Sequence, residues 1–156
     1  MIFEKIVADL LNSQQLKELE RYPSHRFSSK TKQKQNKRRN HCVRVGWLSF
    51  HLCKILGGDA TVCARAGVLH DVGYDYRKVH KPLSQIFGHA EKGAIIAQKM
   101  GENPRVVDAI KTHMFPIGGA PRSKEAFIVW MADKIDALLE VLHLSKLIEK
   151  NLYRTG

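Results

Sequence analysis

The chain has 156 residues, a hydrophobic fraction of 44%, a charged fraction of 26% and a formal net charge of +11. This length suits a single domain, which buries roughly 68–70% of its unfolded surface and needs no disulfide or metal merely to fold. No window approaches the ~18–20 apolar residues of a membrane-spanning helix. Residues 1–12 carry Glu4 and Asp9 within their apolar pattern, which is not typical of a signal peptide.

The cysteine pattern argues against a disulfide-stabilised protein. Cys42, Cys53 and Cys63 form an odd set without a CxxC pair, which disfavours both a disulfide framework and a thiolate zinc site. We therefore expect a reduced, cytoplasmic protein in which the cysteines are small core residues.

The positive charge is concentrated between Lys30 and Arg39, where six residues are basic and none is acidic. Such a run suits a polyanion such as nucleic acid, but it also suits a solvated connector. We favour the connector, because no aromatic residues are interleaved as base-stacking platforms. The resulting division is an N-terminal helix within residues 1–22, a basic connector at 23–40 and a functional domain at 41–156.

Helical spacing of apolar residues dominates the chain, and no alternating run indicates a strand. Helices are expected, in order, over residues 2–20, 41–56, 60–73, 89–100, 104–113 and 124–142. Capping signals support these bounds: Gly57-Gly58 as a stop, and Asp59, Asn103 and Ser123 as N-caps, the last for the longest helix. The pattern predicts five or six helices in one all-α bundle, with loops at 74–83 and 114–122.

Two apolar faces are expected to face the core. On the helix from residue 41 they are Val45, Leu48, Leu52, Ile55 and Leu56; on the helix from residue 124 they are Phe127, Val129, Trp130, Ile135, Leu138, Leu139 and Leu142.

The pair His70-Asp71, within GVLHDVGY, carries the strongest chemical signal. Neighbouring residues lie ~100° apart on a helix, but at a helix end both side chains can turn toward one ion. The other candidate ligands are His41, His89, His113 and Asp133. Imidazoles and carboxylates suit Fe, Mn, Co, Ni or Zn. Four histidines and two aspartates hold two such ions if Asp71 bridges, and such a pair activates water for attack on a phosphate.

Asp133 stands out on internal grounds because it follows the apolar run 128–132 within a predicted helix. A buried aspartate requires a partner or a cation. For Arg44, one turn after His41, two roles are open: contact with a phosphate held at the metal ions, and an exposed position on the helix surface.

In their order on successive helices, His41, His70-Asp71 and Asp133 resemble the ligands of the HD-domain superfamily of metal-dependent phosphohydrolases. The resemblance is carried by the segments RNHCVRVG, AGVLHDVG, GHAEKGA and MADKIDA and covers roughly residues 38–142 of this chain. The chain resembles a small, bacterial-type member of the family with a single domain. The resemblance implies an all-helical fold in which His41, His70, Asp71 and Asp133 bind one metal. It also implies that His89 and His113 bind a second metal, with Asp71 bridging.

The chain departs from the family pattern at two places. Many members carry a lysine shortly after the doublet, where this chain has Tyr74. We select Lys78 as the catalytic residue of the following loop that contacts the phosphate or donates a proton in place of that lysine, although Asp75, Arg77 and His80 share the loop and no spacing rule separates them. Around His113 the chain also lacks the HHExxDGxGYP motif of the family's cyclic-dinucleotide esterases.

The predicted function is a metal-dependent phosphohydrolase that cleaves a phosphoester or phosphoanhydride bond of a nucleotide or similar small compound. Dinucleoside polyphosphates are the first hypothesis, and the net positive charge favours a polyanionic substrate. One alternative is a nucleic-acid-binding or regulatory module that uses Lys30–Arg39. Another is a phosphodiesterase acting on nucleic acid. No membrane partner is expected, and the sequence leaves the oligomeric state and the identity of the metal open.

Overall fold

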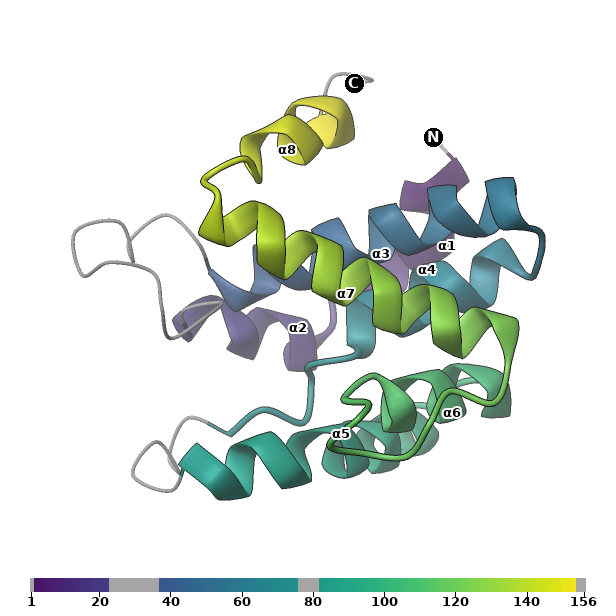
Figure 1. Cartoon of the computed structure of the whole chain (residues 1–156), viewed down its shortest axis with the longest axis vertical. Coiled ribbons are helices and arrows are strands. Elements are labelled where there is room, and N and C mark those ends of the chain that lie inside the picture. Colours follow the sequence, from purple (N-terminus) through teal and green to yellow (C-terminus); the bar gives the residue numbers. More distant parts are fainter. Residues whose placement is uncertain (1, 23–36, 76–81, 154–156) are drawn as a thin grey trace.

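The computed structural model describes residues 2–22, 37–75 and 82–153. These residues form eight α-helices and one 3₁₀ turn without a β-strand, which confirms the predicted all-α class (Figure 1). In chain order they are α1 (Ile2–Leu11), α2 (Gln14–Glu18), η1 (Leu19–Arg21), α3 (Arg38–Leu56), α4 (Ala60–Leu69), α5 (Pro82–Lys99), α6 (Pro104–Thr112), α7 (Lys124–Val141) and α8 (Lys146–Tyr153). Within this described part, none of the helices has the length and apolar character needed to cross a lipid bilayer.

The centre of the molecule is the meeting point of α3, α4 and α7, which all contact one another. Helix α6 packs on α4 and α7, α5 pairs with α6, and α1 covers α4 (Figure 1). The core between these helices is apolar and fully buried at positions such as Val7, Leu10, Leu16, Leu69, Ile110 and Val129. The helices that carry the candidate ligands are therefore packed directly against one another.

The capping signals in the sequence correctly mark where several helices begin and end. The side chains of Asp59, Asn103 and Ser123 each accept a hydrogen bond from a backbone N–H in the first turn of α4, α6 and α7. Gly57 ends α3 with φ 77°, a backbone conformation that glycine adopts without steric cost. These signals are local, so they act in the same way whatever the surrounding packing.

The N-terminal segment is not one helix over residues 2–20. The chain breaks after Leu11, and Ser13 starts α2 by accepting a hydrogen bond from the backbone N–H of Leu16. This cap competes with helix continuation, because a serine side chain offers the backbone an alternative hydrogen-bond partner.

Two helices begin earlier than expected. Helix α3 begins at Arg38 and, with 19 residues, is longer than α7 with 18. Helix α5 begins at Pro82 rather than at His89, so the loop predicted at 74–83 is shorter, and its residues 76–81 lie outside the described part. Helix α8 lies beyond the last predicted helix, and the count of five or six helices was too low.

The end of the basic run is part of the folded core rather than a solvated connector. Arg38 is buried, and Arg39 is half-buried and donates a hydrogen bond to the carbonyl of Leu11 at 3.3 Å. Residues 23–36, which hold the earlier part of the run, lie outside the described residues.

The apolar faces were predicted only in part. Ile55 and Leu56 are 79% and 48% exposed, and Phe127, Leu138 and Leu142 are also exposed. Val45 is buried as predicted. Apart from Val43 and Phe50, the other buried residues of α3 are small or polar, namely Arg38, His41, Cys42, Arg44, Gly46, Ser49 and Cys53. Hydrophobic spacing does not predict these small and polar residues. They are buried because α3 and α4 approach closely and because some of them belong to the polar site.

Gly67 marks the closest approach of α3 and α4. A Cβ atom at Gly67 would lie 2.7 Å from the Cα and 2.9 Å from the backbone nitrogen of Gly46. This contact lies between two backbones, so no side chain can rotate to make room. It holds the end of α4, with His70, against the part of α3 that carries His41.

We expect Gly67→Ala to lower the free energy of unfolding by about 2–3 kcal/mol, because overpacking forces the two backbones apart. The matched control is Gly88→Ala on α5, where no described atom lies within 4 Å of the added Cβ. Alanine is the better helix former, so the control should gain about 0.5–1 kcal/mol. Urea denaturation of both variants measures the difference; equal stability of Gly67→Ala and the unsubstituted chain would contradict this account of the α3–α4 contact.

Candidate metal centre

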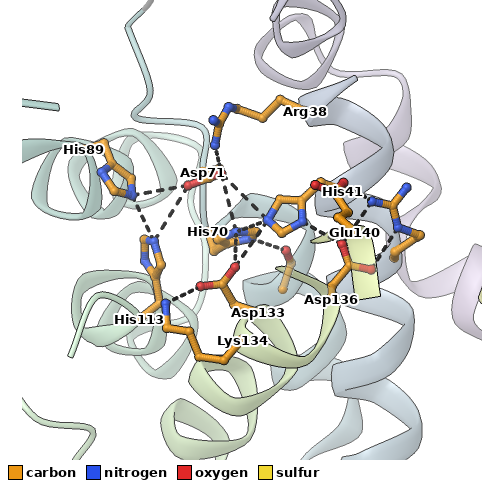
Figure 2. A network of polar contacts seen from close by, with 12 residues as sticks. Arg38, His41, His70, Asp71, His89, His113, Asp133, Lys134, Asp136 and Glu140 are labelled. Carbon is orange, nitrogen blue, oxygen red and sulfur yellow. Dashed lines mark hydrogen bonds and ion pairs between the residues drawn. The ribbon is translucent and has the colours of Figure 1, made fainter. Parts of the chain in front are cut away.

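Six candidate ligands from separate parts of the chain meet in the core (Figure 2). They are His41 on α3, His70 and Asp71 at the end of α4, His89 on α5, His113 directly after α6, and Asp133 on α7. Each of these residues is at most 7% exposed. The structure thus brings together all six residues that the sequence marked as metal ligands.

The first group of ligand atoms surrounds Nε2 of His41. This atom lies 3.2 Å from Nε2 of His70 and 3.3 Å from Oδ1 of Asp133. Oδ2 of Asp71 lies 3.9 Å from Nε2 of His41 and 3.6 Å from Nε2 of His70. Atoms that ligate one ion at ~2.1 Å lie about 3.0–3.4 Å apart in octahedral or tetrahedral geometry. The spacing of this group is close to that requirement.

The second group lies on the other side of Asp71. Its Oδ1 atom is 3.3 Å from Nε2 of His89 and 3.7 Å from Nε2 of His113, and these two nitrogens are 3.1 Å apart. The two oxygens of Asp71 therefore face different groups, and either group could hold one metal ion. Figure 2 shows Asp71 between the His89–His113 pair and the His41–His70 pair.

Hydrogen bonds behind three of the rings fix their orientation. The Nδ1 atoms of His41, His70 and His113 each face an oxygen acceptor. These acceptors are Asp136 Oδ2 at 2.7 Å, Gly67 O at 2.7 Å and Ile110 O at 2.6 Å, respectively. An Nδ1–H that donates to such an acceptor leaves the lone pair on Nε2, which points into the site. The rings are thus held in the tautomer that a metal ligand needs.

The electrostatics of the site favour bound cations. Burial alone would raise the pKa of Asp71 and Asp133, but the positive charge of Arg38 beside Asp71, and the imidazoles beside both, hold each pKa well below its usual range. Burial lowers the pKa of His113, and the neighbouring histidines lower it further, to about 3. Two anionic carboxylates and a neutral imidazole are ready-made donors for a divalent ion.

His41 lies between two carboxylates. Burial alone would lower its pKa, but hydrogen bonds with Asp133 and Asp136 outweigh this effect and raise the pKa to about 10. A metal ion at Nε2 takes the place of a proton there, since a ligating imidazole must be neutral on that nitrogen.

Arg38 is a site residue that the sequence interpretation missed. Its Nη1 atom donates a hydrogen bond to Oδ2 of Asp71, and its guanidinium carbon lies 3.8 Å from the centre of the Tyr74 ring. The signal was its position one turn before His41, which places both residues on the same face of a helix. Tyr74 stands where many family members have lysine. Its ring packs against the Arg38 guanidinium, so the positive charge at this place comes from α3.

Arg44 takes neither of the two roles considered for it, at the metal ions or on the helix surface. Its side chain is 1% exposed, and its guanidinium donates to Asp136 at 2.8 and 3.0 Å, to Glu149 at 2.8 Å and to Glu140. All of these partners are carboxylates, so this placement does not support a phosphate contact. Asp136 and Glu140 were missed, although they follow Asp133 by three and seven residues, a spacing that places all three on one face of α7.

Two lysines remain to be placed relative to the site, Lys78, which was predicted to be catalytic, and Lys134, which was not. Lys78 lies outside the described residues, so its catalytic role stays a prediction. Lys134 is 42% exposed and donates to Oδ2 of Asp133 at 2.6 Å. Lys134 is therefore a cation at the edge of the first group of ligand atoms.

The donor set fits divalent transition-metal ions, because imidazoles and ionised carboxylates are their common ligands. An all-α fold that gathers such a set in its core defines a class of helical proteins with a candidate metal centre. Residues 38–138 match the family model described as the HD domain. The chain therefore belongs to the HD-domain family of metal-dependent phosphohydrolases, which confirms the resemblance inferred from the sequence.

Curated relatives align with the chain over somewhat less than a hundred residues. It is 38% identical over 98 residues to Ribonuclease Y of Cutibacterium acnes, 37% over 95 residues to Ribonuclease Y 2 of Bdellovibrio bacteriovorus, and 35% over 97 residues to Ribonuclease Y of Treponema pallidum. These matches cover 61–63% of this chain but only 17–18% of each relative. The similarity is thus confined to a small part of much longer proteins.

Proposed function

We propose that the chain is a metal-dependent phosphodiesterase that hydrolyses RNA. The observation that carries the proposal is the position of Asp71, whose two oxygens face two separate groups of imidazole nitrogens at 3.3–3.9 Å. The names of the relatives, Ribonuclease Y in each case, favour RNA as the polymer. The match covers less than a fifth of each relative. The activity of the whole relatives is therefore not transferred, and RNA hydrolysis is a proposal about this chain.

The proposed ligands fall into two sets that share Asp71. His41, His70 and Asp133 complete the first set, and His89 and His113 complete the second. When bound, divalent ions in these sets supply the Lewis-acid charge and the activated water that phosphodiester hydrolysis needs.

The chain's own residues position these ligands and receive the phosphate. Arg38 donates to Asp71 and holds the shared carboxylate in place. Asp136 fixes the ring of His41 from behind. Lys134 lies at the edge of the site. Its positive charge would stabilise the negative charge that develops on a phosphate oxygen during hydrolysis.

Phosphoanhydrides of dinucleoside polyphosphates, our first hypothesis from the sequence, can be attacked by the same chemistry. The site geometry does not separate a diester from an anhydride, since both present non-bridging phosphate oxygens to a cationic centre. The names of the relatives favour RNA, so we propose RNA as the first substrate class and dinucleoside polyphosphates as the second.

Incubation of the purified chain with end-labelled RNA, DNA of the same sequence and a diadenosine polyphosphate, each in Mn²⁺, tests the proposal. We expect RNA to be cleaved fastest. Hydrolysis of the small nucleotide with intact RNA would replace the proposal with the first hypothesis. RNA binding without any hydrolysis would favour the nucleic-acid-binding module.

A further inference from the structure

Three partly exposed aromatic rings form a cluster on α7 and the segment after α6, which also carry Asp133 and His113. The ring centre of Trp130 lies 5.5 Å from that of Phe127 and 6.1 Å from that of Phe115. Phe127 is 48% exposed, Phe115 is 39% exposed and Trp130 is half-buried. Large aromatic rings usually bury most of their surface in a core, so a cluster of three partly exposed rings is a candidate contact surface.

The cluster is held in a fixed arrangement. Nε1 of Trp130 donates a hydrogen bond to the carbonyl of Phe115 at 2.9 Å, which ties the loop after α6 to α7. Phe127 and Trp130 lie three residues apart on α7, so their side chains are neighbours on the helix surface. The rings therefore form a preformed platform.

The platform lies close to two of the proposed metal ligands. Phe115 follows His113 by two residues, and Trp130 precedes Asp133 by three, which is about 4.5 Å along the helix axis. Lys134, with its amino group on Asp133, adds a positive charge at the same edge. The aromatic platform suits the base of a nucleotide, and the neighbouring cation and metal ligands suit its phosphate.

We propose that Phe127, Trp130 and Phe115 form a stacking site for a nucleobase adjacent to the phosphodiester that is cleaved. The inference rests on the proposed RNA hydrolysis and adds the residues that recognise the substrate. Stacking on an aromatic face tolerates any base, so the site selects for the presence of a base rather than for sequence.

The test compares two short RNAs of equal length, one complete and one with abasic residues on both sides of a central phosphate. Their affinities are measured by fluorescence anisotropy in Ca²⁺, and their hydrolysis is measured in Mn²⁺. We expect Phe127→Leu, which keeps apolar area but removes the ring, to weaken binding of the complete RNA about 5- to 150-fold. Binding of the abasic RNA and the bound metal content should be unchanged, and Phe127→Tyr should restore affinity.

Leu138→Ala is the matched control, because Leu138 lies on the same face of α7, is 57% exposed and is not aromatic. Equal affinities of Phe127→Leu and the unsubstituted chain for the complete RNA would overturn the stacking site. A loss of affinity for both RNAs alike, or the same loss in Leu138→Ala, would also overturn it. Failure of the unsubstituted chain to hydrolyse either RNA refutes the proposed function instead, while the binding comparison still decides the stacking site.

Discussion

Replacing Asp71 with alanine should abolish metal binding and lower hydrolysis by about 10³-fold or more, the largest effect expected from any single side chain. Asp71 is the residue whose two oxygens face both groups of candidate ligands. Its removal leaves imidazoles without the shared anion and leaves Arg38 without its buried carboxylate partner. Elemental analysis of the purified variant, together with turnover in Mn²⁺, measures both losses.

A second variant and a control separate loss of metal from loss of fold. Asp71→Asn keeps the shape of the side chain and removes the charge, so it should fold and still lose the metal. Glu91→Gln, on α5, removes a carboxylate that pairs with Lys111 at 3.2 Å outside both groups. This control should keep metal and activity. Full metal content and full turnover in a folded Asp71→Ala protein would refute the metal centre.

Asp136→Asn should weaken metal binding about 10- to 100-fold, the second largest effect, because a carboxylate behind a ligating histidine orients the ring and raises its basicity. Asp136 is fully buried, accepts from Nδ1 of His41 at 2.7 Å and accepts two hydrogen bonds from Arg44. An amide at this position presents an N–H₂ group to one of these donors. Titration of the metal-free protein with Mn²⁺ or Zn²⁺ measures the affinity.

Glu149→Gln is the control for this prediction, because Glu149 lies in the same network, is 30% exposed and contacts Arg44 but not His41. It should bind metal as the unsubstituted chain does. A folded Asp136→Asn protein with unchanged metal affinity would show that the contact with His41 has no positioning role.

Local signals explain why much of this molecule was predictable. Asp59, Asn103 and Ser123 cap helices through bonds to their own first turns, so the sequence alone locates them. The ligand types at His70-Asp71 and their order along the chain predicted a convergence that the structure contains. These inferences needed local chemistry, sequence order and the resemblance to the HD-domain family, but no knowledge of packing.

The features that were missed depend on contacts between distant segments. Arg38 looked like part of a solvated basic run, and only the packing of α3 on the end of α4 directs it to Asp71. Arg44 looked like a free cation, yet it is neutralised by carboxylates 92–105 residues away in the chain. Helix α8 is short, and the contact of Glu149 with Arg44 ties it to α3. Spacing within one helix places Arg38 on the face of His41 and Asp136 on the face of Asp133, but it does not identify their partners on other helices.

The most direct test of the central claim is anomalous diffraction at the manganese absorption edge from crystals of the chain grown with Mn²⁺. The account predicts two peaks on either side of Asp71, one next to His41, His70 and Asp133 and the other next to His89 and His113. Strong density for all six side chains with no anomalous peak between them would contradict it.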